Sequence, residues 1–241
     1  MLAVTAVMIV LGIISGIMTR NTQMPFVFGF LTILPITLIM AYYGDGAFWR
    51  KAMIVAFVAI YVVRMLYTLF FWFAATGAAK LKDDLNMGAL IGMPIVLCTV
   101  FAWIYPLPFL HGMSRTGAFD LFDGLAIFAY VIGSVLHFGS DYQKWAFKQN
   151  EENQGKLLQS GFWGMSRHPN YFGDFLIYVS FALSGAWIWG IFSPIANLGQ
   201  YFGDALPKNE KKSAERYGAL WDAYVSATPV FIPMPFGKKK K

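Results

Sequence analysis

The sequence predicts an all-α, polytopic membrane protein with about seven transmembrane helices in a single domain, residues 1–241. Hydrophobic residues make up 57% of the chain and charged residues only 13%, whereas soluble domains average about 25% charged residues. Apolar runs recur along the chain at close to the length of about 20 residues that a spanning helix needs. Because these runs are continuous rather than alternating, a β-barrel is disfavoured.

The apolar runs place the helices in order. Residues 1–18 contain no charge and lack the basic start and small-residue cleavage site of a signal peptide, so they are expected to form the first helix. The next four are expected at residues 25–43, 52–76, 88–105 and 121–140. Residues 171–205 carry no charge except Asp174 and Asp204. They are too many for one span, which predicts a hairpin of two helices that breaks around residues 184–190.

The distribution of Lys and Arg predicts the orientation. If the N-terminus lies outside, the inside segments hold 15 of the 19 basic residues and Arg64 lies within the membrane. The outside loops then hold three, namely Arg50, Lys51 and Arg115. This bias predicts an N-out, C-in, multi-pass membrane protein. It also explains the net charge of +6 without a nucleic-acid partner, and the lysines at 238–241 are expected to lie near anionic lipid.

The sequence carries no metal-binding pattern. Cys98 is the only cysteine, so neither a disulfide within the chain nor a cysteine-based metal site is possible. His111 and His137 stand apart from other metal-ligand residues and are expected to be packed or interfacial.

Residues 141–174 form the longest polar run and are expected to make a ligand-binding loop at the cytoplasmic face. If the preceding helix continues into it, Asp141, Lys144 and Lys148 share one face at spacings of three and seven residues. An acid beside two ammonium groups suits a sugar hydroxyl next to phosphates. The alternative is an interfacial helix with lysines that reach to the headgroups.

The end of this run, SRHPNYFGD at residues 166–174, predicts the start of the next helix. Pro169 suits a first helical turn and Ser166 a cap. With Arg167 and His168 beside the free N–H groups, this helix start could bind an anion. The alternative is a helix cap with an interfacial belt. Asp174 lies deep enough that its carboxylate should face protein or ligand rather than lipid.

Arg64 is expected near the middle of the third helix, where an unpaired charge is costly. Tyr61, Arg64 and Thr68 follow a spacing that puts a phenol, a guanidinium and a hydroxyl on one helix face. A functional role is therefore expected, with Asp174 or a ligand phosphate as the partner of the guanidinium.

Several of these segments, taken together, resemble the steroid 5α-reductase family, and most closely its bacterial membrane branch. The matching segments are Asp141-Tyr142-Gln143, Gly155-Lys156, SGFW at 160–163, SRHPNYFGD, Tyr224 and FIP at 231–233. They cover about residues 121–236, which is the expected cofactor-binding half. Before residue 120 the similarity is limited to Tyr61-x-x-Arg64 and Gln23-Met24-Pro25.

This resemblance implies a seven-helix enzyme that uses NADPH to reduce a carbon–carbon double bond conjugated to a carbonyl in a lipophilic, steroid- or isoprenoid-like substrate. The bacterial branch implies a place in the bacterial inner membrane, with the cofactor site facing the cytoplasm. Tyr61 would polarise the carbonyl and stabilise the enolate that forms. Gln23, in the segment where the family has Gln-Glu before a proline, would be the second catalytic residue. The implied cofactor contacts are Arg64, Asp141, Lys148, Lys156, Arg167, His168, Asn170, Tyr171, Asp174 and Tyr217, with Asp174 in place of the family's usual Glu.

Two other functions stay open from the sequence alone, and the oligomeric state is not predicted. Arg167-His168-Pro169-x-Tyr171 is also similar to a motif of isoprenylcysteine carboxyl and phospholipid methyltransferases, which bind S-adenosylmethionine. A non-catalytic lipid- or protein-binding membrane component is the third possibility. NADPH, which has a 2′-phosphate, should need the cluster of basic residues, whereas S-adenosylmethionine should not.

Overall fold

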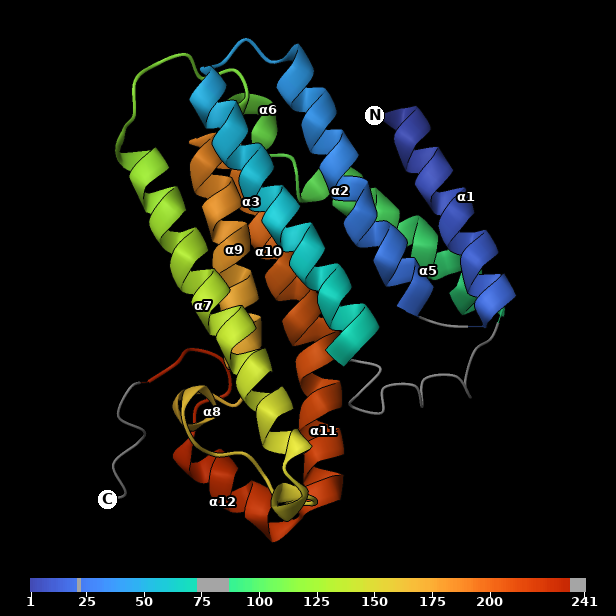
Figure 1. Ribbon diagram of the computed structural model, residues 1–241, viewed down its shortest axis with the longest axis vertical. Coiled ribbons are helices and arrows are strands. Elements are labelled where there is room, and N and C mark those ends of the chain that lie inside the picture. Colours follow the sequence, from blue (N-terminus) through green and yellow to red (C-terminus); the bar gives the residue numbers. More distant parts are fainter. Residues whose placement is uncertain (21–22, 73–86, 235–241) are drawn as a thin grey trace. The chain divides into compact units, whose positions relative to one another are not determined.

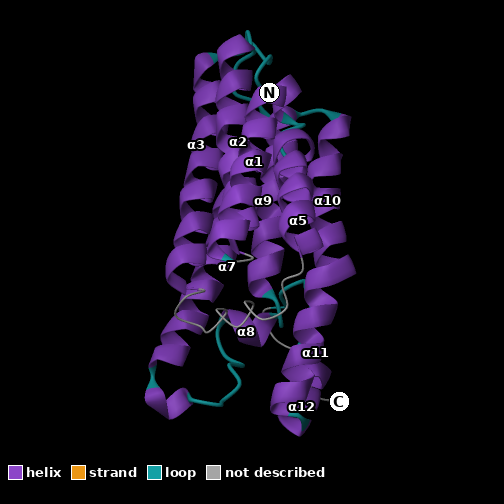
Figure 2. Cartoon of the chain, turned by 90° about the vertical axis from the view of Figure 1, so that its right-hand side faces the viewer, coloured by secondary structure: helices purple, strands orange, loops and turns teal. Residues whose placement is uncertain are grey.

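The computed structural model describes residues 1–20, 23–72 and 87–234 (Figure 1). Every regular element within these ranges is a helix (Figure 2), which confirms the all-α prediction. Residues 73–76 of the third expected helix and the lysines at 238–241 lie outside them, as do Lys80 and Lys82, two of the basic residues counted as inside.

Five helices are long and apolar enough to cross a membrane, judged by length and composition. They are Leu2–Thr19, Gln23–Tyr43, Phe48–Phe71, Met87–Gly112 and Leu121–Gln149. These five correspond to the first five apolar runs, so the prediction of a multi-pass membrane protein is confirmed. The count of seven and the orientation stay predictions.

Most of the remaining helices lie in the predicted hairpin, residues 171–205, and in the C-terminal segment after it. α9 (Pro169–Gly185) ends within the predicted break, and α10 (Phe192–Gln200) begins after a 3₁₀ turn. The described elements are α1 (Leu2–Thr19), α2 (Gln23–Tyr43), α3 (Phe48–Tyr67), α5 (Met87–Thr99), α6 (Phe109–Gly112), α7 (Leu121–Gln149), α8 (Phe162–Met165), α9, α10, α11 (Leu206–Tyr217) and α12 (Ala219–Ala227). π-helical segments continue α3 at Thr68–Trp72, α5 at Val100–Ile104 and α10 at Tyr201–Ala205.

Two predicted boundaries are wrong. α3 begins at Phe48 rather than residue 52. Arg50, which was expected in a loop, therefore belongs to the first turn of this helix and is buried. α7 continues to Gln149 instead of ending at residue 140. The nine residues after Ser140 are mostly polar but contain neither Gly nor Pro, so the helix continues beyond its apolar part.

The chain divides into two compact units. Unit 1 comprises Met1–Ala126 and Phe181–Ser193, and unit 2 comprises Ile127–Ser180 and Pro194–Lys241, the latter described to residue 234.

The core of unit 1 is a packed set of apolar helices. α2 contacts α1, α3 and α5, and α1 also contacts α5 (Figure 1). A Cβ built on Gly12 of α1 would lie 3.0 Å from Pro94 of α5, so a small residue permits this close approach. Ile54, Val58 and Tyr61 repeat at helical spacing on α3 and are at most 1% exposed, which places this face of α3 in the core.

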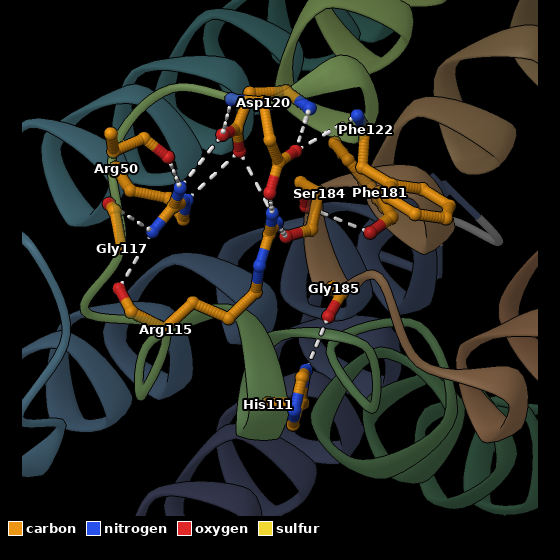
Figure 3. A network of polar contacts seen from close by, with 11 residues as sticks. Arg50, His111, Arg115, Gly117, Asp120, Phe122, Phe181, Ser184 and Gly185 are labelled. Carbon is orange, nitrogen blue, oxygen red and sulfur yellow. Dashed lines mark hydrogen bonds and ion pairs between the residues drawn. The ribbon is translucent and has the colours of Figure 1, made fainter.

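A buried polar network joins four segments of unit 1 (Figure 3). Arg50 donates from Nε and Nη2 to both carboxylate oxygens of Asp123, at 2.9 and 2.7 Å. Arg115 donates to Asp123 Oδ1 at 3.2 Å, to the Ser184 carbonyl at 2.9 Å, and to Asp120. The network ties the start of α3, the segment before α7, α7 itself and the end of α9 together.

In unit 2 two glycines bring α7 and α9 into backbone contact. A Cβ on Gly133 would lie 2.7 Å from the Gly173 carbonyl oxygen, and one on Gly173 would lie 2.3 Å from the His137 backbone nitrogen. No larger residue fits this crossing without moving a helix. The polar residues beside this crossing, His137 of α7 and Asp174 of α9, are therefore brought together.

Candidate functional site

The centre of the candidate site is Asp174, which is 3% exposed on α9. Its Oδ2 accepts hydrogen bonds from two residues of the segment that begins with α10: Asn197 Nδ2 at 2.9 Å and the Tyr201 hydroxyl at 2.5 Å. Asn197 and Tyr201 are four residues apart, so they share one helix face. The other oxygen, Oδ1, lies 3.6 Å from His137 Nδ1 of α7.

The second carboxylate of the site is Asp141, one turn after His137 on α7. Its Oδ1 accepts a hydrogen bond from Asn170 Nδ2 at 3.1 Å, and its Oδ2 lies 3.9 Å from His137 Nε2. The imidazole of His137 is 5% exposed and lies between the two acids. The structure thus brings Asp141, Asn170 and Asp174 together, three residues that the sequence had grouped.

Two buried amide oxygens border this cluster without a hydrogen-bond partner among the described residues. They are Asn170 Oδ1 and Asn197 Oδ1. Each belongs to an amide whose nitrogen already donates to an aspartate. The cluster is therefore rich in acceptors, and unpaired buried acceptors are unfavourable unless a ligand or water donates to them.

Aromatic rings stack beside the acids. Tyr171 lies between His168 and Tyr201, with ring centroids 5.1 and 4.3 Å away and planes within 15° of parallel. Its hydroxyl accepts a hydrogen bond from Asn209 Nδ2 at 2.6 Å. Tyr171 thus links the helix start that the sequence singled out to the Tyr201 side of the Asp174 cluster.

Arg167 and His168 both contact Glu210 of α11. Arg167 forms a two-point ion pair with this carboxylate, 2.8 Å between Nη2 and Oε2, and His168 Nε2 lies 2.7 Å from Oε1. Arg167 Nη1 also donates to the carbonyls of Val225 and Thr228. The Arg167 guanidinium therefore holds the C-terminal segment in place through hydrogen bonds to other residues of the protein.

The electrostatics of this contact favour an ionised Glu210 beside a neutral His168. Burial lowers the pKa of His168 below its ordinary value, although Glu210 opposes the shift. Burial alone would raise the pKa of Glu210, but hydrogen bonds from His168 and Arg167 outweigh it and the pKa falls below its ordinary value.

The C-terminal segment after α12 packs onto the SRHP segment. The Arg167 amide donates to the Pro229 carbonyl at 2.8 Å, and Ser166 Oγ donates to the Phe231 carbonyl at 2.9 Å. Ser166 Oγ also accepts from the His168 amide at 3.1 Å, so it holds the turn before α9 rather than capping the helix itself. The Tyr224 hydroxyl donates to the Trp163 carbonyl. The residues that carry the family resemblance therefore hold one another in place.

Lys144, Lys148 and Arg216 of unit 2 are exposed, whereas Asp174 is buried. Lys144 and Lys148 of α7 lie close enough to Arg216 of α11 for their charges to interact. Lys144 Nζ is 4.4 Å from the centre of the Trp163 ring. Lys156 is exposed in the loop, and the half-buried ring of Tyr217 lies 5.2 Å from the Arg216 guanidinium carbon.

The remaining predicted site residues, Gln23, Tyr61 and Arg64, belong to unit 1. Tyr61 is 1% exposed, and its ring contacts Phe30 and Phe181 edge-on. Arg64 is half-buried with Nη1 3.4 Å from Met65 Sδ. Gln23 is the first residue of α2. None of the three lines the pocket of about 240 Å³ that opens between Met40, Tyr43 and Met113 in the same unit.

Sequence reasoning missed four polar residues of unit 2. His137 was expected to be merely packed, and Asn197, Tyr201 and Glu210 were not singled out at all. Asn197 and Tyr201 lie in the long uncharged run, where their spacing of four residues was the available signal. Glu210 lies among the lysines of α11 and resembles a solvent-exposed helix charge.

Comparisons with known proteins fit this picture. Over 115 residues the chain is 32% identical to a Delta(14)-sterol reductase of Arabidopsis thaliana, covering 42% of this chain and 30% of the relative. Over 161 residues it is 30% identical to a Delta(14)-sterol reductase of Ascobolus immersus, covering 58% and 34%. A probable 7-dehydrocholesterol reductase of Acanthamoeba polyphaga mimivirus is 26% identical over 141 residues, covering 49% and 30%. The matched part is about a third of each relative's length.

The match to a family model is much more extensive. It covers residues 12–228, and therefore nearly all of both units. The family is described as a protein of unknown function, DUF1295. The chain belongs to the DUF1295 family, and its relatives include sterol reductases.

Proposed function

We propose that this protein is a membrane-embedded, NADPH-dependent reductase of a carbon–carbon double bond, conjugated to a carbonyl, in a lipophilic steroid- or isoprenoid-like substrate. The observation that carries the proposal is the buried cluster of Asp141, Asn170 and Asp174 on α7 and α9. The names of the sterol reductase relatives support the reaction class.

The residues of unit 2 fit the chemistry of NADPH. The carboxylates of Asp141 and Asp174, on neighbouring helices, and the unpaired amide oxygens can accept hydrogen bonds from the hydroxyl and amide groups of NADPH. Lys148, with Lys144 and Arg216 nearby, offers positive charge to its phosphates. NADPH would supply a hydride, and the buried cluster would exclude water from its surroundings.

The assignment of individual basic residues differs in strength. Arg167 and His168 contact Glu210 and the C-terminal segment, which suits a role in holding the SRHP segment against α11. Lys156 is exposed and could reach a phosphate at the edge of the site. The half-buried ring of Tyr217 offers a flat surface for a base. The ring of Tyr171 already stacks on His168 and Tyr201, so its contact with the cofactor would come from its hydroxyl.

Tyr61 is proposed as the acid that polarises the substrate carbonyl, with Arg64 one turn further along α3 and Gln23 at the start of α2. A phenol aimed at a developing oxyanion stabilises it and can donate a proton. The apolar surroundings of Tyr61, which include Phe30 and Phe181, suit a lipophilic substrate.

The test of the cofactor site is the affinity of the detergent-purified protein for NADPH in an Asp174→Ala variant. Loss of a charged hydrogen-bonding group is expected to weaken binding by about 10- to 150-fold. Asp222→Ala removes an exposed acid of α12 and serves as the matched control, with unchanged affinity expected. Unchanged affinity in Asp174→Ala, with its helical content intact, would remove Asp174 from the site.

The test of Tyr61 is turnover. Tyr61→Phe keeps the ring that contacts Phe30 and Phe181 but removes the hydroxyl. It is expected to bind NADPH like the wild type and to lose most NADPH oxidation with enone steroids or isoprenoids. A variant that turns over as fast as the wild type would show that another group acts as the acid.

A further inference from the structure

Asn197 of α10 is a buried amide that neither the sequence motifs nor the comparisons assign to a role. It is 2% exposed, its Nδ2 donates to Asp174 at 2.9 Å, and its Oδ1 has no hydrogen-bond partner among the described residues. Buried amide oxygens are nearly always paired, so an unpaired one beside an ionisable cluster points to a missing donor.

The orientation of this amide is fixed by its neighbour. An ionised carboxylate can only accept hydrogen bonds, so the amide nitrogen must face Asp174 and the oxygen must point elsewhere. Turning the amide over would place its oxygen against a carboxylate oxygen. Asn170 repeats the arrangement, because its nitrogen donates to Asp141 at 3.1 Å and its oxygen is also buried and unpaired.

Two donors on this side of the site already serve Asp174. The Tyr201 hydroxyl donates to the same Asp174 oxygen as Asn197, at 2.5 Å. The two buried amide oxygens, by contrast, are acceptors available to a ligand. An NH₂ group presents two donors and almost no acceptor, so it matches such a wall better than a hydroxyl, which also needs a donor.

We propose that Asn197 is a ligand-binding residue whose Oδ1 accepts a hydrogen bond from an NH₂ group of the nicotinamide cofactor, and that Tyr201 positions Asp174 behind it. The inference rests on the proposed function and adds a residue and a chemical group to it. A nicotinamide dinucleotide carries two such groups: the carboxamide on the nicotinamide ring and the amine on the adenine.

The experiment measures dissociation constants for three reduced cofactors on the full-length, detergent-purified protein. NADPH carries both NH₂ groups. Its 3-acetylpyridine analogue replaces the carboxamide NH₂ with a methyl group, and its hypoxanthine analogue replaces the adenine amine with an oxygen. The wild type is expected to bind one of the two analogues about 5- to 150-fold more weakly than NADPH, because the acceptor is then left unpaired. The analogue that binds more weakly identifies which of the two NH₂ groups donates to Asn197 Oδ1.

Asn197→Thr and Tyr201→Phe locate the effect. Thr keeps a hydroxyl that can donate to Asp174 but puts a methyl group near the position of the amide oxygen. It should bind NADPH more weakly and lose the discrimination against the weak analogue. Tyr201→Phe removes a donor to the same carboxylate oxygen and leaves the amide in place. It should weaken all three cofactors by a similar factor and keep the discrimination.

The outcomes separate the two proposals. A wild type that does not bind NADPH overturns the proposed function, and this inference with it. A wild type that binds all three cofactors equally overturns the inference alone, since water would then suffice for the buried oxygens. Discrimination that persists in Asn197→Thr, or in Asn197→Ser if the former does not fold, assigns the contact to another residue and also refutes it.

Discussion

The strongest stability prediction concerns the buried ion pair in unit 1. Arg50 is 1% exposed and Asp123 is 0% exposed. Asp123 accepts hydrogen bonds from two nitrogens of Arg50, from Arg115 and from the Asp120 amide. Replacing Asp123 by Ala leaves the guanidinium of Arg50 buried without its counter-ion. Breaking a buried pair by removal of one partner costs about 3–5 kcal/mol.

The assay is thermal unfolding of the detergent-purified protein followed by far-UV circular dichroism. For a chain of 150–250 residues, each kcal/mol shifts Tm by about 2–4 °C, so Asp123→Ala should lower it by roughly 6–20 °C. Glu215→Ala is the control, because its ion pair with Lys211 is formed by side chains that are 64% and 80% exposed. That change should shift Tm by no more than about 2 °C.

A double variant tests the reasoning rather than the position alone. Arg50→Met with Asp123→Leu removes both charges and keeps apolar volume, and such replacements are often neutral or stabilising. It should regain at least half of the loss seen in Asp123→Ala. If Asp123→Ala unfolds within about 2 °C of the wild type, or if the double variant is the less stable of the two, the pair does not hold the segments of unit 1 together.

Two further predictions concern unit 2. Gly173→Ala should destabilise the protein by about 1–3 kcal/mol or more, because its Cβ would lie 2.3 Å from the His137 backbone nitrogen. Gly199→Ala has no atom within 4 Å of its Cβ among the described residues and should be neutral or stabilising in the same thermal assay; equal losses would contradict the close helix contact. The pKa values of His168 and Glu210 both lie below their ordinary 6.5 and 4.5, so their contribution to stability is present above these values and is lost as pH falls through the folded-state values. Tm of the wild type should therefore decline on acidification below about pH 6.5. Compared with Glu215→Gln, the Glu210→Gln variant should have a lower Tm at pH 7 and a flatter decline of Tm below pH 4.5. Parallel curves of Tm against pH for the two variants would contradict this.

The helices of unit 1 could be predicted because a continuous apolar run of about 20 residues is by itself typical of a membrane-spanning helix. The start of α3 could not be predicted in the same way, since the burial of a charged residue depends on a partner that is distant in the sequence. Arg50 was counted as a loop charge, yet Asp123, 73 residues away, pairs with it inside the fold. The extension of α7 was missed for a related reason. Polar residues after Ser140 continue a helix as readily as they end it, and Gln143 then ties this extension to the loop through Ser160 and Phe162.

The candidate site shows a similar limit. Asp141, Asn170 and Asp174 could be grouped because they belong to matching motifs and because an acid in a membrane helix needs a partner. His137, Asn197 and Tyr201 could not, because a single polar residue in an apolar run gives no sign of which helix it faces. The close approach of α7 and α9 at Gly133 and Gly173 decides this, and it is a property of the packed backbone.

The most direct test of the central claim is ligand-dependent thermal stability of the purified protein with NADPH, NADH and S-adenosylmethionine. A ligand that binds only the folded state at a hundredfold excess over Kd stabilises it by about 2.7 kcal/mol. We predict a shift with NADPH, a smaller one with NADH, which lacks the 2′-phosphate, and none with S-adenosylmethionine. A shift with S-adenosylmethionine alone would assign the Arg167-His168-Pro169 motif to a methyltransferase and contradict the proposed reductase.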